Sequence, residues 1–344
     1  MRILVINPGS TSTKVAVYED ERPVLLRNIR HTADELQQYA TSFDQLPLRQ
    51  NKIVQTLEEE EIPFEFDAIV GRGGLTHPIP AGVYRVNAQM LHDTRTAIRQ
   101  HVCNLGCHIA AALASQIDHC EALIADPVIV DEMCAEARIC GSPNMARNSV
   151  WHALNQRATA RRHALAIGRR YEDLDLIVAH LGGGITIGVH HHGRTIDVNN
   201  GLDGEGPFSP ERAGTLPSSD LIRMCFSGEY TEEELLRFVG GKAGLMAWLG
   251  TSDTREILDR IENGDEEAKL IMDAMIYHIA KGIAAQAAVL CGRYDAILIT
   301  GGLAHAHYIT SRLRERVSFI APVHIYPGEN EMEALAENAL AVLR

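Results

Sequence analysis

Short runs of consecutive apolar residues alternate along the chain with longer stretches in which apolar residues recur at helical spacing. The runs at 3–6, 176–179 and 296–299 are typical of strands buried on both faces, whereas the spacing at 266–290 and 331–343 predicts amphipathic helices. Strands and helices that alternate in this way predict an α/β fold.

The same two patterns predict the other elements. Strands are expected at 1–7, 14–20, 23–29, 67–71, 121–131 and 323–326, and helices at 33–61, 89–102, 105–118, 146–170, 218–226, 231–239 and 254–261. Pro and Gly residues predict loops at 78–82 and 199–212. Asp131 is expected to end the strand at 121–131, and a further helix is expected after Gly302.

Residues 177–197 combine an apolar strand with a turn of three consecutive glycines, Gly182, Gly183 and Gly184. The alternating residues that follow predict a second strand, and a turn near Gly193 predicts a third. Glycine has no side chain to obstruct a ligand, and a turn that exposes backbone N–H groups favours an anion such as phosphate. The turn alone does not establish a phosphate site, because glycine-rich hairpin turns are common.

A similar segment begins the chain, where the apolar run at 3–6 leads into Asn7, Pro8 and Gly9. Aligning Asn7 with His180, an offset of 180 − 7 = 173, superposes a strand, a polar residue, a glycine turn and two further strands in both segments. The repeat predicts a duplicated lobe, with the two glycine turns facing each other across a cleft.

The chain of 344 residues is long enough for two domains with separate cores. Its hydrophobic content of 46% and charged content of 22% are typical of globular proteins. The formal net charge of −13 argues against nucleic acid or an anionic membrane as a partner. A phosphate ligand would therefore depend on local Arg and Lys side chains and on backbone N–H groups.

Neither a secretory signal nor a membrane-spanning apolar run is expected, and seven cysteines at irregular spacings favour reduced thiols in a cytoplasmic protein. Cys103, Cys107 and His108 lack the spacing of structural zinc ligands, so no metal site is expected there. The tract at 190–192, three consecutive histidines, resembles a metal-binding segment, but we expect it to be a solvated hairpin turn.

Several longer motifs resemble the acetate and butyrate kinase family. Residues 7–14 match its N-x-G-S-x-S-x-K signature, and residues 180–185 match its second phosphate motif. Residues 152–156, 198–214 and 326–334 are similar to the butyrate kinases in particular. The resemblance spans nearly the whole chain in the expected order.

The resemblance implies the fold of the superfamily of acetate and sugar kinases, heat-shock chaperones and actin. This is an α/β fold of two duplicated ribonuclease-H-like lobes with a nucleotide cleft between them. Residues 1–143, with a C-terminal helix at about 331–344, would form the N-terminal lobe on the carboxylate side. Residues 144–330 would form the C-terminal lobe on the nucleotide side, and the implied assembly is a homo-oligomer, a dimer or larger.

The resemblance also implies a reversible transfer of the γ-phosphoryl group of ATP to a short-chain fatty acid, butyrate or a branched analogue, giving an acyl phosphate and ADP. The transition state of phosphoryl transfer is loose and charged, so catalysis depends on positioning and on cationic groups. Arg72 and Arg212 match the family's two arginines, which can fork to a carboxylate and to phosphoryl oxygens. The carboxylate is already ionised at neutral pH, so no general base is needed.

His180 matches the family histidine that contacts the transferring phosphoryl group, and His152 matches a second histidine near the cleft. Without the resemblance, a histidine at a strand end and another in a helix would be ordinary structural residues. Acetate kinases carry Ser-His where this chain has Asn155 and Gln156, so no catalytic histidine carries over to Gln156.

Magnesium prefers oxygen ligands and keeps several waters, so one or two carboxylates are sufficient. The resemblance implies Asp131 as a catalytic residue and the first Mg²⁺ ligand, and Glu331 as the second ligand, with Glu329 and Glu333 as alternatives to Glu331. The residues implied for ATP and ADP are Asn7, Ser10, Ser12, Lys14, Gly182, Gly183 and Gly184 at the phosphates, and Gly301 and Gly302 at the adenosine.

Other interpretations fit parts of the sequence. An acetate or propionate kinase is disfavoured by Asn155, Gln156 and the motif at 207–212. A non-catalytic actin-like ATP-binding protein would be expected to lack the pair Arg72 and Arg212, and a sugar kinase would need a polar pocket and an Asp base. One methylene changes binding by only about 1–3 kcal/mol, so the sequence leaves the acyl chain length open.

Overall fold

The computed structural model describes residues 1–97 and 100–344. The chain divides into two compact units, which we call unit 1 (residues 1–131 and 330–344) and unit 2 (residues 132–329). The predicted lobes change at 143/144 instead, because the regular structure in residues 132–143 is only the short helix α5 (Ala135–Arg138), which shows no clear apolar period. Their contacts include hydrogen bonds from the Cys134 N–H to the Ile196 carbonyl and from the Thr195 N–H to the Glu132 carboxylate.

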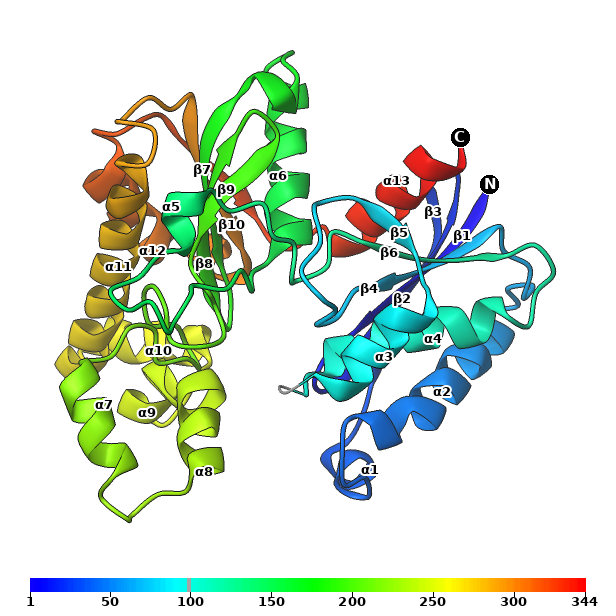
Figure 1. The fold of residues 1–344 in the computed structure, drawn as a ribbon, viewed down its shortest axis with the longest axis horizontal. Helices are drawn as coiled ribbons and strands as arrows, with labels where there is room; N and C mark the ends of the chain where they lie inside the picture. Colours follow the sequence, from blue (N-terminus) through cyan, green and yellow to red (C-terminus); the bar gives the residue numbers. More distant parts are fainter. Residues whose placement is uncertain (98–99) are drawn as a thin grey trace. The chain divides into compact units, whose positions relative to one another are not determined.

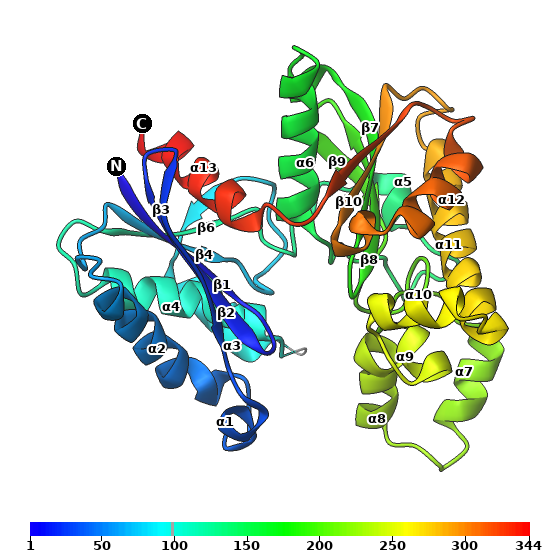
Figure 2. The same cartoon turned by 180° about the vertical axis from the view of Figure 1, so that it is seen from behind.

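Unit 1 contains a six-stranded sheet in the order β3-β2-β1-β4-β6-β5 (Figures 1 and 2). Its strands are β1 (Arg2–Pro8), β2 (Ser12–Glu19), β3 (Arg22–Arg30), β4 (Ala68–Arg72), β5 (Val83–Arg85) and β6 (Glu121–Ala125). The first three strands form an antiparallel meander, and β4 and β6 extend the sheet parallel to β1. Residues 3–6 of β1 are buried on both faces, which is why the run is continuously apolar.

The helices of unit 1 cover both faces of this sheet. They are α1 (Ala33–Gln37), α2 (Leu46–Glu59), α3 (Ala88–Thr96), α4 (Leu105–Ala114) and α13 (Glu331–Leu343). Apolar residues of α2 and α4 pack with those of β1 and β2 in one core, and α13 lies on the opposite face (Figure 1). The C-terminal helix is therefore part of the same unit as the N-terminal strand.

Two predicted elements of unit 1 are wrong in extent. The helix expected at 33–61 is broken after α1, and α2 begins at Leu46, where Pro47 occupies the first turn and has no N–H to give to a preceding helix. The strand expected at 121–131 ends at Ala125. Asp126 has a left-handed φ of 38°, and its carboxylate accepts the N–H of Gly82 instead of continuing the strand.

The helix expected at 89–102 corresponds to α3, and the part of it at 98–99 lies outside the described residues. The short strand β5 and the helices α5 (Ala135–Arg138) and α9 (Gly244–Leu249) were not predicted. These elements are too short to show a clear apolar period.

Unit 2 contains a five-stranded sheet in the order β11-β10-β7-β8-β9. Its strands are β7 (Asp175–Leu181), β8 (Ile185–His191), β9 (Arg194–Val198), β10 (Ala296–Gly301) and β11 (Val323–Pro327). Its other helices are α6 (Ala153–Ala166), α7 (Ser218–Cys225), α8 (Glu232–Arg237), α10 (Thr254–Glu262), α11 (Glu266–Ala287) and α12 (His307–Val317).

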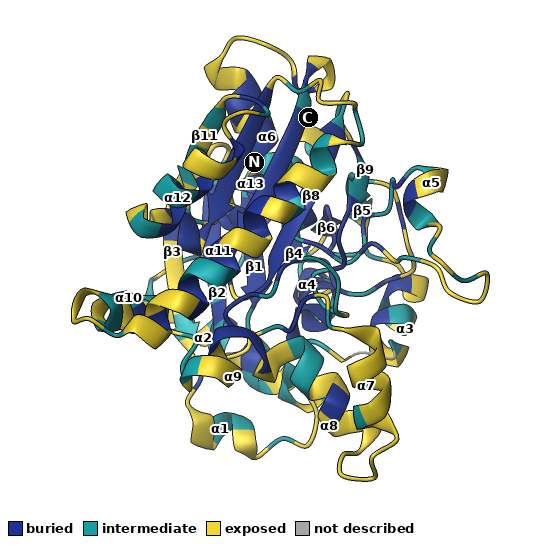
Figure 3. Cartoon of the chain, turned by 90° about the vertical axis from the view of Figure 1, so that its left-hand side faces the viewer, coloured by how far each residue is buried: buried dark blue, intermediate teal, exposed yellow. Residues whose placement is uncertain are grey.

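Successive residues of β7 supply the two cores of unit 2. Leu176 and Val178 pack with α6, whereas Ile177 and Ala179 pack with α11 and α12 on the other face. The alternation follows from the two-residue period of a strand. Figure 3 shows β8, the neighbour of β7 in the sheet, as buried, while parts of α11 and α12 are exposed.

The two units repeat one topology, which confirms the predicted duplication. The order β1-β2-β3-α2-β4-α4-β6 in unit 1 matches β7-β8-β9-α11-β10-α12-β11 in unit 2. In both, an antiparallel meander is followed by two strands parallel to its first strand. Among the described residues, no helix combines the length and the apolar content needed to cross a membrane.

Candidate functional site

In unit 1, three predicted site residues meet where β1 and β4 end. Parallel pairing of β1 with β4 sets Ile6 beside Gly71, so Asn7 and Arg72, the next residues on each strand, lie close together. Glu331, the first residue of α13, accepts a hydrogen bond of 2.5 Å from the Asn7 amide and lies 3.3 Å from the Arg72 guanidinium. The Arg72 side chain remains 21% exposed, so a ligand can reach a guanidinium whose orientation is set by a buried carboxylate.

The structure distinguishes the three glutamates that the sequence leaves open. Glu331 is only 2% exposed and contacts Asn7 and Arg72. Glu329 belongs to unit 2, where its carboxylate lies 3.4 Å from the His180 imidazole, and Glu333 lines a hollow on another side of α13. Of the three, Glu331 is therefore the carboxylate that lies beside the predicted substrate arginine.

The turn between β1 and β2 carries the other predicted residues of unit 1. The Gly9 N–H donates to the Ser12 carbonyl at 2.7 Å, which closes the turn, and Ser10 is exposed at its tip. Ser12 begins β2, and Lys14 is the cross-strand partner of Asn7. Lys14 and Asn7 are therefore neighbours, as expected for residues that line one phosphate group.

A residue that the sequence reasoning missed holds this turn in place. The Arg49 side chain is fully buried and donates hydrogen bonds to the carbonyls of Gly9 (3.0 Å) and Ser12 (3.2 Å) and to the Thr13 hydroxyl (3.0 Å). Burial lowers the pKa of Arg49 to about 10, so it remains charged at neutral pH. The carbonyls of Gly9 and Ser12 therefore face Arg49 and are not available to a ligand. An Arg within an amphipathic helix gives no sequence signal for this role.

Asp131 lies in a different setting from the predicted one. The residues before it form a loop with a single bridge between Ile79 and Val130, and the Asp131 N–H donates to the Ile79 carbonyl at 2.9 Å. It therefore does not end a strand. It remains in unit 1, with Arg72 and Glu331, and its side chain is partly exposed.

In unit 2, His180 lies on β7 within a network of buried polar groups. The Asn155 amide donates to His180 Nδ1 at 2.6 Å, so a neutral ring carries its proton on Nε2. The His152 ring stacks on it, with centroids 3.8 Å apart and planes 8° from parallel. His152 precedes α6 as its N-cap and pairs with the Thr186 hydroxyl at 2.9 Å, so the expectation that it lies within a helix is wrong. The loop containing Trp151 and His152 replaces the first part of the helix predicted at 146–170.

Two of the three glycines of unit 2 lie directly against predicted site residues. A Cβ on Gly182 would lie 3.0 Å from His180 Nε2, and a Cβ on Gly184 would lie 2.2 Å from Arg212 Nη1. Arg212 also donates a short hydrogen bond to the Gly201 carbonyl, and its own N–H donates to the Ser209 hydroxyl. The glycine turn therefore packs against an imidazole and a guanidinium, both of which can donate hydrogen bonds to an anion.

The two glycines of the predicted adenosine motif, Gly301 and Gly302, lie in different surroundings. Gly301 ends β10 with a left-handed φ of 92°, and a Cβ there would lie 2.3 Å from the Leu181 carbonyl. The close approach of β10 to β7 is therefore enough to explain why position 301 is a glycine. A Cβ on Gly302 would have no atom within 4 Å, so its backbone lies beside open space that can admit a ligand.

The histidine tract at 190–192 and the cysteines lie outside the predicted site, and the tract matches its predicted structure only in part. His190 is fully buried and contacts the Tyr171 hydroxyl at 2.6 Å, and burial lowers its pKa well below the usual value. His191 is the partly exposed last residue of β8, so the expected solvated turn holds only for His192. All seven cysteines have free thiols, and burial raises the pKa of Cys103 to about 11. A protonated thiol is a poor metal ligand.

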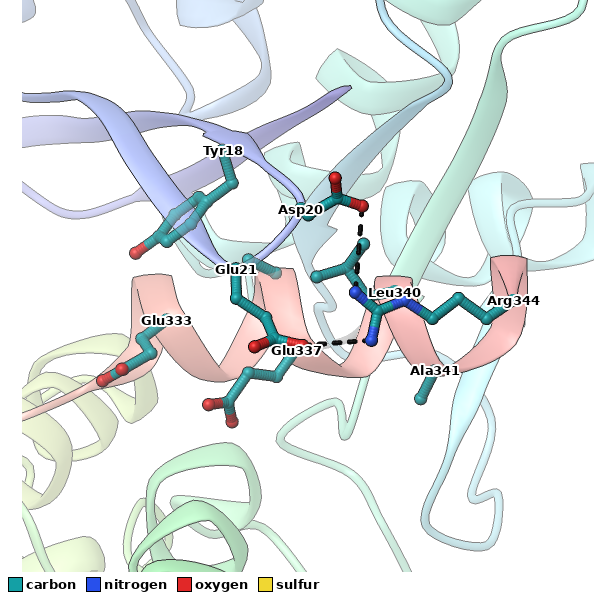
Figure 4. A pocket seen from close by; sticks show the side chains of 9 residues that line it. Tyr18, Asp20, Glu21, Glu333, Glu337, Leu340, Ala341 and Arg344 are labelled. Carbon is teal, nitrogen blue, oxygen red and sulfur yellow. Dashed lines mark hydrogen bonds and ion pairs between the residues drawn. The ribbon is translucent and has the colours of Figure 1, made fainter. Parts of the chain in front are cut away.

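A hollow of about 410 Å³ between α13 and the β2–β3 hairpin is lined by carboxylates (Figure 4). Glu333 and Glu337 lie on α13, Asp20 and Glu21 on the hairpin, and Arg344 pairs with Glu21 at 3.0 Å. Four acidic groups against one arginine repel phosphates. This hollow is therefore distinct from the face of α13 where Glu331 contacts Asn7 and Arg72.

Duplicated meanders that each present a polar residue and a glycine turn define an α/β protein of the ribonuclease-H-like, actin-type class. Residues 146–336 match the model of the acetokinase family. The chain is 60% identical over 344 residues to a probable butyrate kinase of Bacteroides thetaiotaomicron, covering 100% of this chain and 98% of the relative. It is 48% identical to butyrate kinase 1 of Clostridium acetobutylicum, covering 100% and 97%.

Among solved structures, Porphyromonas gingivalis acetate kinase matches with a TM-score of 0.81, 18% identity and full coverage of both chains. At that identity the likeness describes the fold alone. The chain belongs to the acetokinase family. The resemblance carried by the sequence motifs is thereby confirmed.

Proposed function

We propose that this protein transfers the γ-phosphoryl group of ATP to a short-chain fatty acid, butyrate or a branched analogue, and that the reaction is reversible. The products are an acyl phosphate and ADP. The observation that carries the proposal is identity of 48–60% over the whole chain with proteins named as butyrate kinases. The arginines at the end of β4 and beside the second glycine turn support it, because phosphoryl transfer needs cations around the transferred group.

The chemistry is an in-line displacement. A carboxylate oxygen of the acid forms a bond to the γ-phosphorus while the bond from that phosphorus to the β,γ-bridging oxygen breaks, and ADP leaves with the electron pair. In our proposal Arg72 orients the acid, and Arg212 stabilises the charge on the equatorial oxygens. His180 donates its Nε2 proton in a hydrogen bond to the same group, because Asn155 occupies Nδ1.

We propose that the phosphates of the nucleotide bind at both glycine turns. Asn7, Lys14 and the N–H groups of the first turn would contact phosphates from unit 1, and the turn at 182–184 would contact them from unit 2. Gly302 supports the proposed adenosine site, because its backbone lies beside open space. Ser10 and Ser12 would add hydroxyl donors to the first turn.

Asp131 and Glu331 would hold Mg²⁺. The donor set fits this ion, because both are carboxylates of unit 1, and Mg²⁺ takes one or two carboxylates and otherwise waters and phosphates. When bound, the ion neutralises charge on the β- and γ-phosphates. Arg72 and Asn7 already contact the Glu331 carboxylate and set its orientation.

We further propose that the protein is a cytoplasmic homo-oligomer, without nucleic acid or membrane as partners.

Acyl phosphate formation, captured as the hydroxamate, tests the proposal across acetate, propionate, butyrate, isobutyrate and isovalerate. We expect butyrate or a branched acid to give the highest kcat/KM. A preference for acetate or propionate would favour the alternative kinase, and filament formation without acyl phosphate would favour an actin-like protein. Arg212→Ala should remove most turnover and leave nucleotide binding nearly unchanged, whereas Arg223→Ala, in an exposed pair with Asp220, serves as the matched control.

A further inference from the structure

Asp175, His191 and His192 form a cluster at one end of the sheet of unit 2. Each offers one ligand atom, and these atoms lie within 4.8 Å of one another. The cluster and the glycine turn at 182–184 lie at opposite ends of β8, which at about 3.3 Å per residue separates them by roughly 20 Å. It is therefore separate from the residues assigned to phosphoryl transfer.

The backbone brings these three side chains together. Asp175 and His191 are cross-strand partners in the antiparallel pairing of β7 with β8. His190 is fully buried, whereas His191 is the last residue of β8 and is partly exposed. His192 and Gly193 have left-handed φ values of 49° and 81°, which is typical of a two-residue hairpin turn, and the turn places the His192 ring 4.2 Å from that of His191.

A hydrogen bond from outside the cluster sets the orientation of the His192 ring, whereas the His191 ring contacts Asp175, a member of the same cluster. His191 Nδ1 lies 2.6 Å from the Asp175 carboxylate. His192 Nδ1 lies 3.0 Å from the Glu172 carbonyl, which can only accept, so the Nε2 of a neutral ring carries the lone pair. Metal-binding histidines commonly donate their second ring N–H to a backbone carbonyl in this way. His191 is 40% exposed and His192 is exposed, so an ion can enter from solvent.

We propose that Asp175, His191 and His192 bind one divalent ion of the zinc class, with water as the fourth ligand. Two imidazoles and one carboxylate suit Zn²⁺ and related transition ions, whereas Mg²⁺ prefers oxygen ligands alone. Ligand atoms of a tetrahedral Zn²⁺ site at 2.0–2.1 Å from the ion lie about 3.3 Å apart. Small side-chain rotations at an exposed hairpin end therefore complete the geometry. The bound ion links the start of β7 to the β8–β9 turn.

Zn²⁺ titration of the untagged full-length protein, followed by calorimetry in the presence of Mg²⁺, tests this site. The key variant is His192→Asn, because Asn is favoured at a left-handed turn position and preserves the hairpin. We expect the wild type to bind one Zn²⁺ that His192→Asn binds at least about tenfold more weakly, as loss of even an outer-shell partner costs that much. Equal stoichiometry and affinity in the two proteins would overturn the proposal.

The matched control is His77→Asn. His77 makes the same 2.6 Å contact with a carboxylate, that of Asp93, as His191 makes with Asp175. We expect His77→Asn to bind Zn²⁺ as the wild type does. If this variant loses the ion, the ion binds at His77 and not at the proposed cluster, which would refute our assignment. If His192→Asn fails to fold, as measured by thermal unfolding, Asp175→Asn provides the same comparison.

Exposed thiols could also take up zinc, so the ligand type needs its own measurement. Cys225 and Cys291 are exposed. With Co²⁺ as the probe, a site made of imidazole and carboxylate shows ligand-field bands without a thiolate-to-cobalt charge-transfer band. We expect that spectrum for the ion that His192→Asn loses. A charge-transfer band that disappears with His192→Asn would contradict the ligand set.

Discussion

Gly184→Ala tests whether glycine is needed at this position to leave space for the Arg212 guanidinium. The new Cβ would lie 2.2 Å from Arg212 Nη1 and 2.5 Å from its Cζ. Ordinary contact begins at 3.4 Å, so Nη1 must move by at least 3.4 − 2.2 = 1.2 Å. Gly184 is not among the residues with a left-handed φ, so alanine is compatible with its backbone. The substitution therefore acts mainly on the position of the guanidinium.

The expected cost falls on catalysis rather than on stability. A displacement of about 1 Å in a catalytic group can lower the rate about 10²-fold, which corresponds to about 2.7 kcal/mol in the activation barrier. Alanine stabilises a compatible site by about 0.4–1 kcal/mol through the unfolded chain. Loss of the hydrogen bond from the charged Arg212 to the part-buried Gly201 carbonyl costs about 1.5 kcal/mol, the low end for a charged donor, which leaves a net loss of about 0.5–1 kcal/mol.

The hydroxamate assay with butyrate gives kcat/KM, and thermal unfolding of the same samples gives the stability. We expect kcat/KM of Gly184→Ala to fall about 10²-fold with little change in the unfolding midpoint. Gly141→Ala is the control, because a Cβ there meets no atom within 4 Å. Wild-type turnover in Gly184→Ala would refute the role of Arg212, and a large loss of stability would show that the turn is structural.

Three further predictions follow from individual contacts. Arg49→Met removes charge-assisted hydrogen bonds from two part-buried carbonyls and should lower the unfolding free energy by about 2–5 kcal/mol in denaturant titrations. The exposed control Arg27→Met should cost under about 1 kcal/mol. Equal losses would contradict the role of Arg49. Glu331→Gln should raise the Mg²⁺ concentration for half-maximal turnover at least about tenfold, and an unchanged Mg²⁺ dependence would argue against Glu331 as a ligand. Burial lowers the pKa of His31 from 6.5 to about 4, so the unfolded chain binds a proton first and the unfolding free energy should fall as the pH drops through that range. His31→Gln should flatten this dependence, and an unaltered pH profile would assign it to other histidines.

Local patterns were sufficient for the parts of the fold that depend on nearest neighbours. The apolar run at 3–6 and the alternation after the glycine turn predicted the strands, and the repeat at an offset of 173 residues predicted the duplicated lobe. These features depend on strand period and on glycine, which act within a few residues. Where a single residue changed the local backbone, as Asp126 does, the predicted extent of the strand was wrong.

The sequence alone determined the class of fold, the positions of the two glycine turns and the family. Only the tertiary structure decided which side chains orient the glycine turns and the residues beside them. Arg49 reaches Gly9 across 40 positions of the chain, and Glu331 reaches Asn7 across 324. It also paired His191 with Asp175 through strand register. Such contacts depend on how whole strands and helices pack and register, and no local spacing encodes that arrangement.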